Sequence, residues 1–241
     1  MRASTSRSER HESNGRRQLA TVDARGIGRR APKGEGWLIR DVHLEIHPGD
    51  RLAIFGPSGA GKTVLLRALA MLDPLDRGEI YWKGEAVRAE DVPSYRKDII
   101  LLHQRPALSE GSVGENLQYP FSLKVHRGRH FDRECIIALL EGLGRDESFL
   151  EKPTRDLSGG EAQLVALLRA IQLDPEVLLL DEPTASLDRA TACAVEGLLD
   201  RWYSGRAGER SLVWISHDLE QARRVTGRRL TMQSGRLQPG R

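Results

Sequence analysis

The chain has 241 residues, of which 39% are hydrophobic, with a formal net charge of +3 and two cysteines. This length allows one sizeable core, or a main domain that carries a smaller subdomain. No apolar run approaches the roughly 18 residues of a spanning helix, and the amino-terminus lacks the apolar core of a signal peptide. The composition thus excludes a membrane-spanning protein, and a charge this mild gives us no reason to expect a nucleic-acid partner.

The amino-terminal region divides into a polar tail and a strand-rich segment. Residues 1–18 are rich in Ser, Arg and Glu, and we expect a disordered basic tail that is solvated rather than bound to anionic lipid. Residues 19–22 indicate a first strand, and residues 25–36 read as a loop rich in glycine and arginine. The apolar residues at 37–39 and the alternation at 42–46 predict strands that lead toward the next motif.

A glycine-rich motif follows the apolar run at residues 52–55 and precedes a helical pattern at 64–70; it consists of Gly56, Pro57, Ser58, Gly59, Ala60, Gly61, Lys62 and Thr63. Strand, glycine-rich loop and helix are the context that a phosphate-binding P-loop requires, because glycines let successive N–H groups face one anion. Lys62 would then reach the terminal phosphates, and the Thr63 hydroxyl would hold Mg²⁺. The alternative is an ordinary tight turn, which the flanking strand and helix disfavour. We expect the helix to stop near Pro74.

Three later apolar strands each end in polar residues. The run at 99–102 leads to Gln104, the run at 177–180 leads to Asp181 and Glu182, and the run at 211–216 leads to His217. Ligands of open α/β sheets bind at the carboxyl ends of the strands, so we expect these side chains beside the P-loop. Asp181 suits Mg²⁺, and Glu182 suits polarising an attacking water. The alternative for the two carboxylates is a helix N-cap. Helices at 191–202 and 219–225 and strands at 79–82 and 230–232 complete the pattern.

Residues 107–173 lack strand signals and show helical periodicity, notably at 131–143 and 164–171, which predicts an inserted helical subdomain. Within it, Ser158, Gly159 and Gly160 begin a helix whose positive end offers a second anion site. The alternative is an ordinary capping box between Ser158 and Glu161, and both interpretations can hold together. Two phosphate sites in one chain are explained if two copies sandwich the nucleotide head-to-tail.

The motifs GPSGAGKT, Gln104, LSGGEAQ, VLLLDEPTASLD and His217 occur in the order seen in ATP-binding cassette (ABC) ATPases, and this resemblance covers residues 19–235. It implies a single α/β P-loop NTPase domain over 19–241, with an amino-terminal antiparallel β portion, a mostly parallel core sheet and the helical subdomain. It also implies ATP and Mg²⁺ as ligands, with Walker A roles for the P-loop. The remaining implied roles are a sensor of Mg²⁺ and of the transmembrane partner at Gln104, contacts to the opposite protomer's γ-phosphate at Ser158 and Gly160, a Walker B aspartate at Asp181, the catalytic base at Glu182, a dimer contact at Asp188 and a switch histidine at His217.

One element departs from the family pattern. ABC ATPases usually stack the adenine on an aromatic residue upstream of Walker A, but residues 1–36 contain no Trp, Tyr or Phe. The expected position falls near Lys33. Trp37 is the nearest ring, and we expect it to pack inside its strand. An arginine from residues 25–30 could stack on the base instead.

A single compact cassette resembles the ATPase subunit of a transporter that docks on separate transmembrane permease subunits, at the inner face of the cell membrane. Soluble members of the family carry two cassettes, long coiled coils or zinc modules, which this sequence lacks. Residues 95–117 and 212–218 look like the small ATPases of bacterial iron-export systems, so we expect export, of iron or another metal. An ATPase that drives lipoprotein release or envelope remodelling, and a soluble ABC ATPase, stay open as alternatives.

Overall fold

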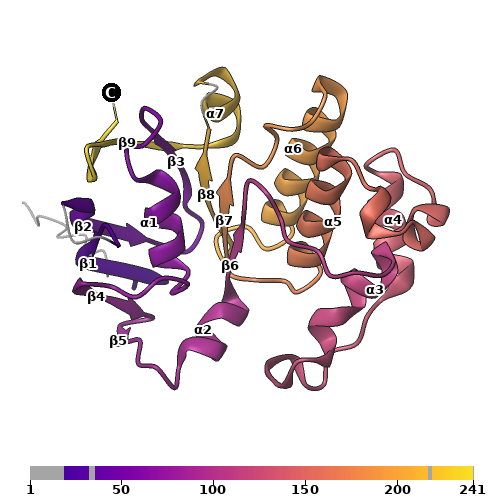
Figure 1. Cartoon of the computed structure of the whole chain (residues 1–241), viewed down its shortest axis with the longest axis horizontal. Helices are drawn as coiled ribbons and strands as arrows, with labels where there is room; N and C mark the ends of the chain where they lie inside the picture. The colour runs from indigo at the N-terminus through magenta and orange to yellow at the C-terminus, as the bar shows by residue number, and fades with distance from the viewer. Residues whose placement is uncertain (1–18, 33–35, 217–218, 241) are drawn as a thin grey trace, which may run out of the picture.

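The structure, a computed structural model, describes residues 19–32, 36–216 and 219–240. The expectations for the tail at residues 1–18, for Lys33 and for His217 lie outside the described residues. Figure 1 shows an antiparallel sheet at one end, a larger sheet in the middle and a group of helices at the other end. No helix in the described part of the chain is both long enough and apolar enough to cross a bilayer.

The antiparallel sheet has the strand order β2-β1-β4-β5, formed by β1 (Val22–Arg30), β2 (Trp37–Ile46), β4 (Arg77–Trp82) and β5 (Glu85–Ala86). Because β1 pairs with both β2 and β4, the loop predicted for residues 25–36 is wrong: the strand continues to Arg30. The register shifts between Ala24 and Ile27, beside Gly26 at φ +59°, and this bulge lets the strand absorb a glycine- and arginine-rich stretch.

The larger sheet has the order β10-β9-β3-β8-β7-β6. Its strands are β3 (Arg51–Phe55), β6 (Ile99–Leu102), β7 (Val177–Asp181), β8 (Ser211–Ile215), β9 (Arg228–Gln233) and β10 (Arg236–Pro239). All neighbouring pairs are parallel except β9 and β10, so the predicted mostly parallel core sheet is confirmed. Every residue of β7 is buried, as is typical of a central parallel strand.

Helices lie on both sides of this sheet (Figure 1). They are α1 (Lys62–Leu69), α2 (Val92–Asp98), α3 (Val113–Gln118), α4 (Arg133–Glu141), α5 (Gly159–Ile171), α6 (Arg189–Ser204) and α7 (Leu219–Val225), with short 3-10 turns between α3 and α5. The periodicity at 131–143 and 164–171 thus predicted α4 and α5 correctly. Helix α1 ends at Leu69, before Pro74, because Met71 turns the chain at φ +54°.

The core consists of two hydrophobic clusters, one on each face of the parallel sheet. Alternate residues of β7 face opposite ways, with Leu179 in the cluster that contains α1 and the antiparallel sheet, and Leu178 in the cluster that contains α5 and α6. The sheet is therefore covered on both faces. A ligand can reach it only at the ends of its strands, where ligands of open α/β sheets bind.

Candidate functional site

The register of the parallel sheet brings four strand ends to one edge. Ile54 of β3 lies opposite Ile215 of β8, Ile215 lies opposite Asp181 of β7, and Leu102 of β6 lies opposite Leu180 of β7. The P-loop and the carboxyl ends of β6, β7 and β8 therefore lie at the same edge of the sheet. This is the arrangement that the sequence pattern predicts for a ligand site.

The P-loop is a tight turn that only glycine can make at two positions. A Cβ atom on Gly56, at φ +148°, would lie 2.1 Å from the main-chain oxygen of Met232. A Cβ atom on Gly61, at φ +103°, would lie 2.5 Å from the main-chain oxygen of Leu38. Both side-chain-free positions let the loop pack against neighbouring backbone just before α1 begins, so the first N–H groups of the helix point toward the loop.

Lys62 lies folded over this loop. Its Nζ donates hydrogen bonds to the main-chain oxygens of Gly56 at 2.8 Å and Pro57 at 3.1 Å. Burial lowers the pKa of Lys62, while the charges of Glu182 and Asp181 act in the opposite direction. The ammonium group is thus held at the loop by neutral acceptors. A phosphate is a charged acceptor that forms stronger hydrogen bonds, so it can take their place.

Asp181 and Thr63, two residues predicted to hold Mg²⁺, lie close enough to interact. Asp181 is only 3% exposed. Burial raises the pKa of Asp181, and the Thr63 side chain offsets part of that rise. An oxygen pair of this kind, at the end of a buried strand, has the donor atoms that Mg²⁺ prefers.

The third predicted oxygen ligand, Gln104, reaches the neighbouring carboxylate instead. Its Nε2 donates a hydrogen bond of 2.9 Å to Oε2 of Glu182. Glu182 adopts a left-handed φ of +50°, and its N–H donates to the main-chain oxygen of Ile215 at 3.1 Å. A non-glycine residue held in this region of φ/ψ space is strained, which is typical of functional sites.

The start of α5 forms the capping box that the sequence indicates. The Ser158 hydroxyl accepts from the Glu161 N–H at 3.1 Å, and the Glu161 carboxylate accepts from the Ser158 N–H at 2.9 Å. A Cβ atom on Gly160 would lie 3.0 Å from the Leu187 side chain, whereas one on Gly159 would meet nothing within 4 Å. Gly160 is therefore needed for close packing, and Gly159 lies beside open space.

Asp188 caps the start of α6. Its carboxylate accepts hydrogen bonds from the N–H of Thr191 at 3.0 Å and from the Thr191 hydroxyl at 2.6 Å, and these bonds lower the pKa of Asp188. Since a Cβ atom on Gly160 would meet Leu187, which precedes Asp188, the segment at residues 158–160 and this cap are neighbours. No hydrogen bond or ion pair within the described residues joins Ser158, Gly159 or Gly160 to the P-loop.

Two polar residues near the site received no role from the sequence, although the first of them, Gln163, ends the LSGGEAQ motif. Gln163 of α5 is 2% exposed, and its Nε2 lies 3.3 Å from the main-chain oxygen of His103, so it links α5 to the segment after β6. Lys152 contacts Glu161 of the capping box. The LSGGEAQ motif, which contains Gln163, is the signal that could have indicated this residue, whereas Lys152 is nine residues from its partner and carries no such signal.

The residues considered for adenine stacking are mostly engaged with protein groups. Trp37 packs on β1 as expected, since a Cβ atom on Gly28 would lie 2.7 Å from its ring. Arg25 lies 3.9 Å from the centre of the Tyr81 ring, and Arg29 pairs with an aspartate at 3.0 Å. The Arg30 guanidinium lies 4.9 Å from the centre of the Trp37 ring.

Comparisons with known proteins agree with this site. A family model described as ABC transporter matches residues 39–185. The "Probable anion import ATP-binding protein" of Haloferax volcanii is 35% identical, over 91% of this chain and 80% of its own length. The "Probable iron export ATP-binding protein FetA" of Escherichia coli strain K12 is 31% identical, over 78% of this chain and 81% of its own.

Among solved structures, an ATP-binding cassette described as dimeric, in a post-hydrolysis state with ADP and Pi bound, matches with a TM-score of 0.79 and 27% identity. The match covers 91% of this chain and 99% of that one. Because the family model and the relatives each span most of the chain and include the P-loop edge of the sheet, this protein belongs to the ABC transporter family, as an ATP-binding cassette that hydrolyses ATP.

Proposed function

We propose that two copies of this chain close head-to-tail around ATP and thereby drive a membrane permease. The observation that carries the proposal is that one chain holds two anion-binding helix starts, at α1 and α5, with no hydrogen bond or ion pair between them among the described residues. A second copy would bring Ser158 to the phosphates held by Lys62. The Ser158 hydroxyl accepts the Glu161 N–H, so its own proton can be donated to a phosphate oxygen.

Within each site, the roles follow from the donor groups. Lys62 neutralises the terminal phosphates, and Thr63, Asp181 and Gln104 supply the oxygen atoms that would hold Mg²⁺. When bound, Mg²⁺ neutralises charge on the phosphates. Glu182 accepts the proton of the attacking water, and Gln104 orients its carboxylate. Asp188 contacts the other copy, and His217 acts as the switch residue.

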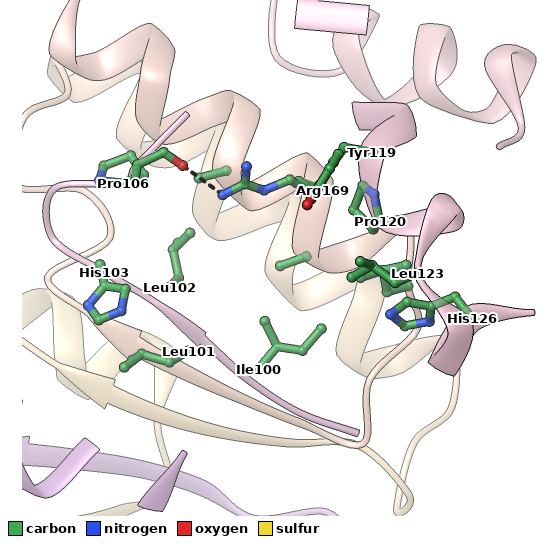
Figure 2. Close-up of a pocket in the computed structure, with 14 residues that line it drawn as sticks. Ile100, Leu101, Leu102, His103, Pro106, Tyr119, Pro120, Leu123, His126 and Arg169 are labelled. Atoms are coloured by element: carbon green, nitrogen blue, oxygen red, sulfur yellow. Dashed lines mark hydrogen bonds between the residues drawn. The ribbon is translucent and has the colours of Figure 1, made fainter. Parts of the chain in front are cut away.

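A groove beside this site suits the permease. A cavity of about 380 Å³ lies between the end of β6 and the helices of residues 107–173, the proposed helical subdomain. Figure 2 shows Ile100 and Leu102 on one side and Tyr119, Pro120 and Leu123 on the other. The side chains of Tyr119 and Leu123 are 56% and 42% exposed, unusually high for large apolar residues.

The loop beside the groove is anchored at its rim. Arg169 of α5 donates a hydrogen bond of 3.0 Å to the main-chain oxygen of Ala107. Gln104 lies three residues earlier, so a helix end of the permease that enters the groove would push on the segment that holds Glu182. Such docking would hold the chain at the inner face of the membrane, through its partner.

For the direction of transport, we propose export of iron or another metal ion, supported by the likeness to FetA. The relative named for anion import is 35% identical over more of this chain, and this favours anion import as a second candidate. Deletion of the gene separates the two: export predicts a rise in cell-associated iron, whereas import predicts a fall in uptake of labelled sulfate or phosphate. If neither quantity changes, iron export and the import of sulfate or phosphate are both wrong.

The paired mechanism has its own test. Hydrolysis of Mg-ATP by the purified chain should rise more than linearly with protein concentration, because each complete site needs two copies. Strict proportionality well below the micromolar range would contradict the head-to-tail pair. Co-purification of the chain with a membrane protein encoded beside it, from detergent extracts, would test the permease partner independently.

A further inference from the structure

Lys152 closes the capping box at the start of α5 from outside the helix. Its Nζ donates to both carboxylate oxygens of Glu161, at 2.9 Å each. The Glu161 side chain is 13% exposed and that of Lys152 is 34% exposed, so the pair is partly shielded from water. The next cation, Arg145, lies 3.9 Å from the same carboxylate. Lys152 therefore makes the main charged contact of Glu161.

Glu161 in turn fixes Ser158. Burial acts to raise the pKa of Glu161, but the hydrogen bonds from the Ser158 N–H and from Lys152 lower it further than burial raises it. The carboxylate is consequently charged and bound on two sides at neutral pH. Its position sets the position of the Ser158 backbone, and the backbone sets where the Ser158 hydroxyl points.

The main chain around Lys152 is tied to the loop after β6. The Lys152 oxygen accepts from the Val113 N–H at 3.0 Å, and the Thr154 N–H donates to the Gly111 oxygen at 2.8 Å. The Thr154 hydroxyl also donates to the Ser109 oxygen at 2.9 Å. Lys152 is thus joined through its backbone to the segment at residues 107–116, which ends in the first turn of α3, and through its side chain and Glu161 to Ser158.

We propose that Lys152 is a positioning residue for ATP-dependent pairing, which holds Ser158 through Glu161 and transmits the position of the 107–116 loop to it. This rests on the proposed contact of Ser158 with the ATP of the other copy. A symmetric pair contains two such serines. Loss of a partly exposed ion pair should weaken the dimer about threefold at each of its two sites. The dissociation constant of the dimer should then rise about tenfold.

The test uses the full chain with Glu182→Gln, in which the ATP-bound pair should persist. Lys152→Met is added, and the pair is measured with Mg-ATP by analytical ultracentrifugation. We expect a dissociation constant about tenfold higher, with binding of a fluorescent ATP analogue to the monomer unchanged. Lys152→Arg should restore pairing, since a guanidinium also donates two bonds to a carboxylate. Arg133→Met, which removes an exposed pair with Glu147, is the matched control and should pair normally.

Three outcomes overturn the inference. The first is a dissociation constant of the Lys152→Met dimer within twofold of its parent. The second is additive effects of Lys152→Met and Glu161→Gln, since action through Glu161 predicts no further loss in the double variant. The third is a failure of Lys152→Arg to restore dimerisation. If Lys152→Met does not fold, Glu161→Gln alone must weaken the pair. Ser158→Ala distinguishes the proposed function from the role of Lys152. If Ser158→Ala dimerises normally, the proposed function is refuted. If Ser158→Ala fails to dimerise while Lys152→Met dimerises normally, only the role of Lys152 is refuted.

Discussion

Gln104 and Glu182 are joined by a hydrogen bond of 2.9 Å although they lie 78 positions apart in the chain. The bond connects the end of β6 to the end of β7, and it holds the carboxylate that we propose as the catalytic base. Because β6 leads into the loop at residues 107–116, a movement of that loop would release the carboxylate. We therefore expect the orientation of the proposed base to depend on the segment beside the groove that we propose for the permease.

Replacing Gln104 by Glu tests this bond. Two carboxylates at hydrogen-bond distance would share a proton, which raises the pKa of the pair. We expect ATP hydrolysis at pH 7 to fall about tenfold and to recover as the pH rises. Rates between pH 6 and 9.5 measure the effect, and Gln104→Ala should not shift the profile. A profile for Gln104→Glu equal to that of the wild type would show that the bond is absent from the active state.

Glu182→Gln should separate binding from chemistry. The amide keeps the size of the side chain and can still contact Gln104, but it cannot accept a proton. Hydrolysis should fall by about 10²–10⁴-fold while ATP binding persists, so the variant should run as an ATP-dependent dimer on size exclusion and the wild type mostly as a monomer. Hydrolysis within about threefold of wild type would mean that the base is elsewhere, with His217 the next candidate.

Asp181→Asn should stabilise the nucleotide-free protein and weaken Mg-ATP binding. Since burial raises the pKa of Asp181, the folded state binds this proton more tightly than the unfolded state, and stability is lost as the pH rises through the folded-state pKa. The amide removes that loss, so the melting temperature at pH 7 should rise. The rise in melting temperature on adding Mg-ATP should be smaller in Asp181→Asn than in the wild type. Asp200→Asn, at a side chain that is 60% exposed and paired with Arg51 at 2.7 Å, should lower the melting temperature only slightly and leave the response to Mg-ATP unchanged. An unchanged Mg-ATP response in Asp181→Asn would exclude this residue from the metal site.

Two glycines of the P-loop should differ in their tolerance of a methyl group. Gly56→Ala would place a Cβ atom 2.1 Å from a backbone oxygen and should destabilise the fold by about 2–4 kcal/mol. Gly59→Ala, at φ +76° with open space around it, should cost about 1 kcal/mol. Urea unfolding of the nucleotide-free proteins measures both. Equal losses would show that the loop relaxes away from β9.

The groove should crosslink to the permease. In a chain with Cys135→Ser and Cys193→Ser, single cysteines at Tyr119 and Leu123 should form disulfides with cysteines in the partner's cytoplasmic loops. Glu85→Cys, an exposed position on β5 in the antiparallel sheet, is the control and should remain uncrosslinked. No crosslink at either groove position in an active complex, or equal crosslinking at Glu85, would reject this surface as the docking site.

The sequence predicted the parallel strands well, because apolar runs such as residues 177–180 have few other interpretations. It misassigned β1, since glycines and arginines at positions 25–30 are typical of loops and the strand exists only because two neighbours pair with it. The β9–β10 hairpin was predicted only in part, as residues 236–239 carry a single large apolar side chain. Tertiary pairing decided both elements, and no local pattern records it.

Within the site, short-range features were predictable and long-range contacts were not. The capping box of Ser158 and Glu161 follows from a spacing of three residues, and it is present. The P-loop turn follows from its glycines. The contact of Gln104 with Glu182 depends on side-chain rotamers across two strand ends, and that of Lys152 with Glu161 depends on how separate turns pack. Sequence spacing contains no information on either distance.

The position of β3 in the sheet has a consequence for biosynthesis. This strand carries the P-loop, yet its two neighbours, β8 and β9, follow it by about 160 and 175 residues. A ribosome must therefore release nearly all of the described chain before the P-loop strand has any partner in its sheet. ATP cannot assist the early folding of the emerging polypeptide, and contacts of such long sequence separation form slowly. Until synthesis is almost finished, the apolar residues of β3 therefore lack both of their partner strands.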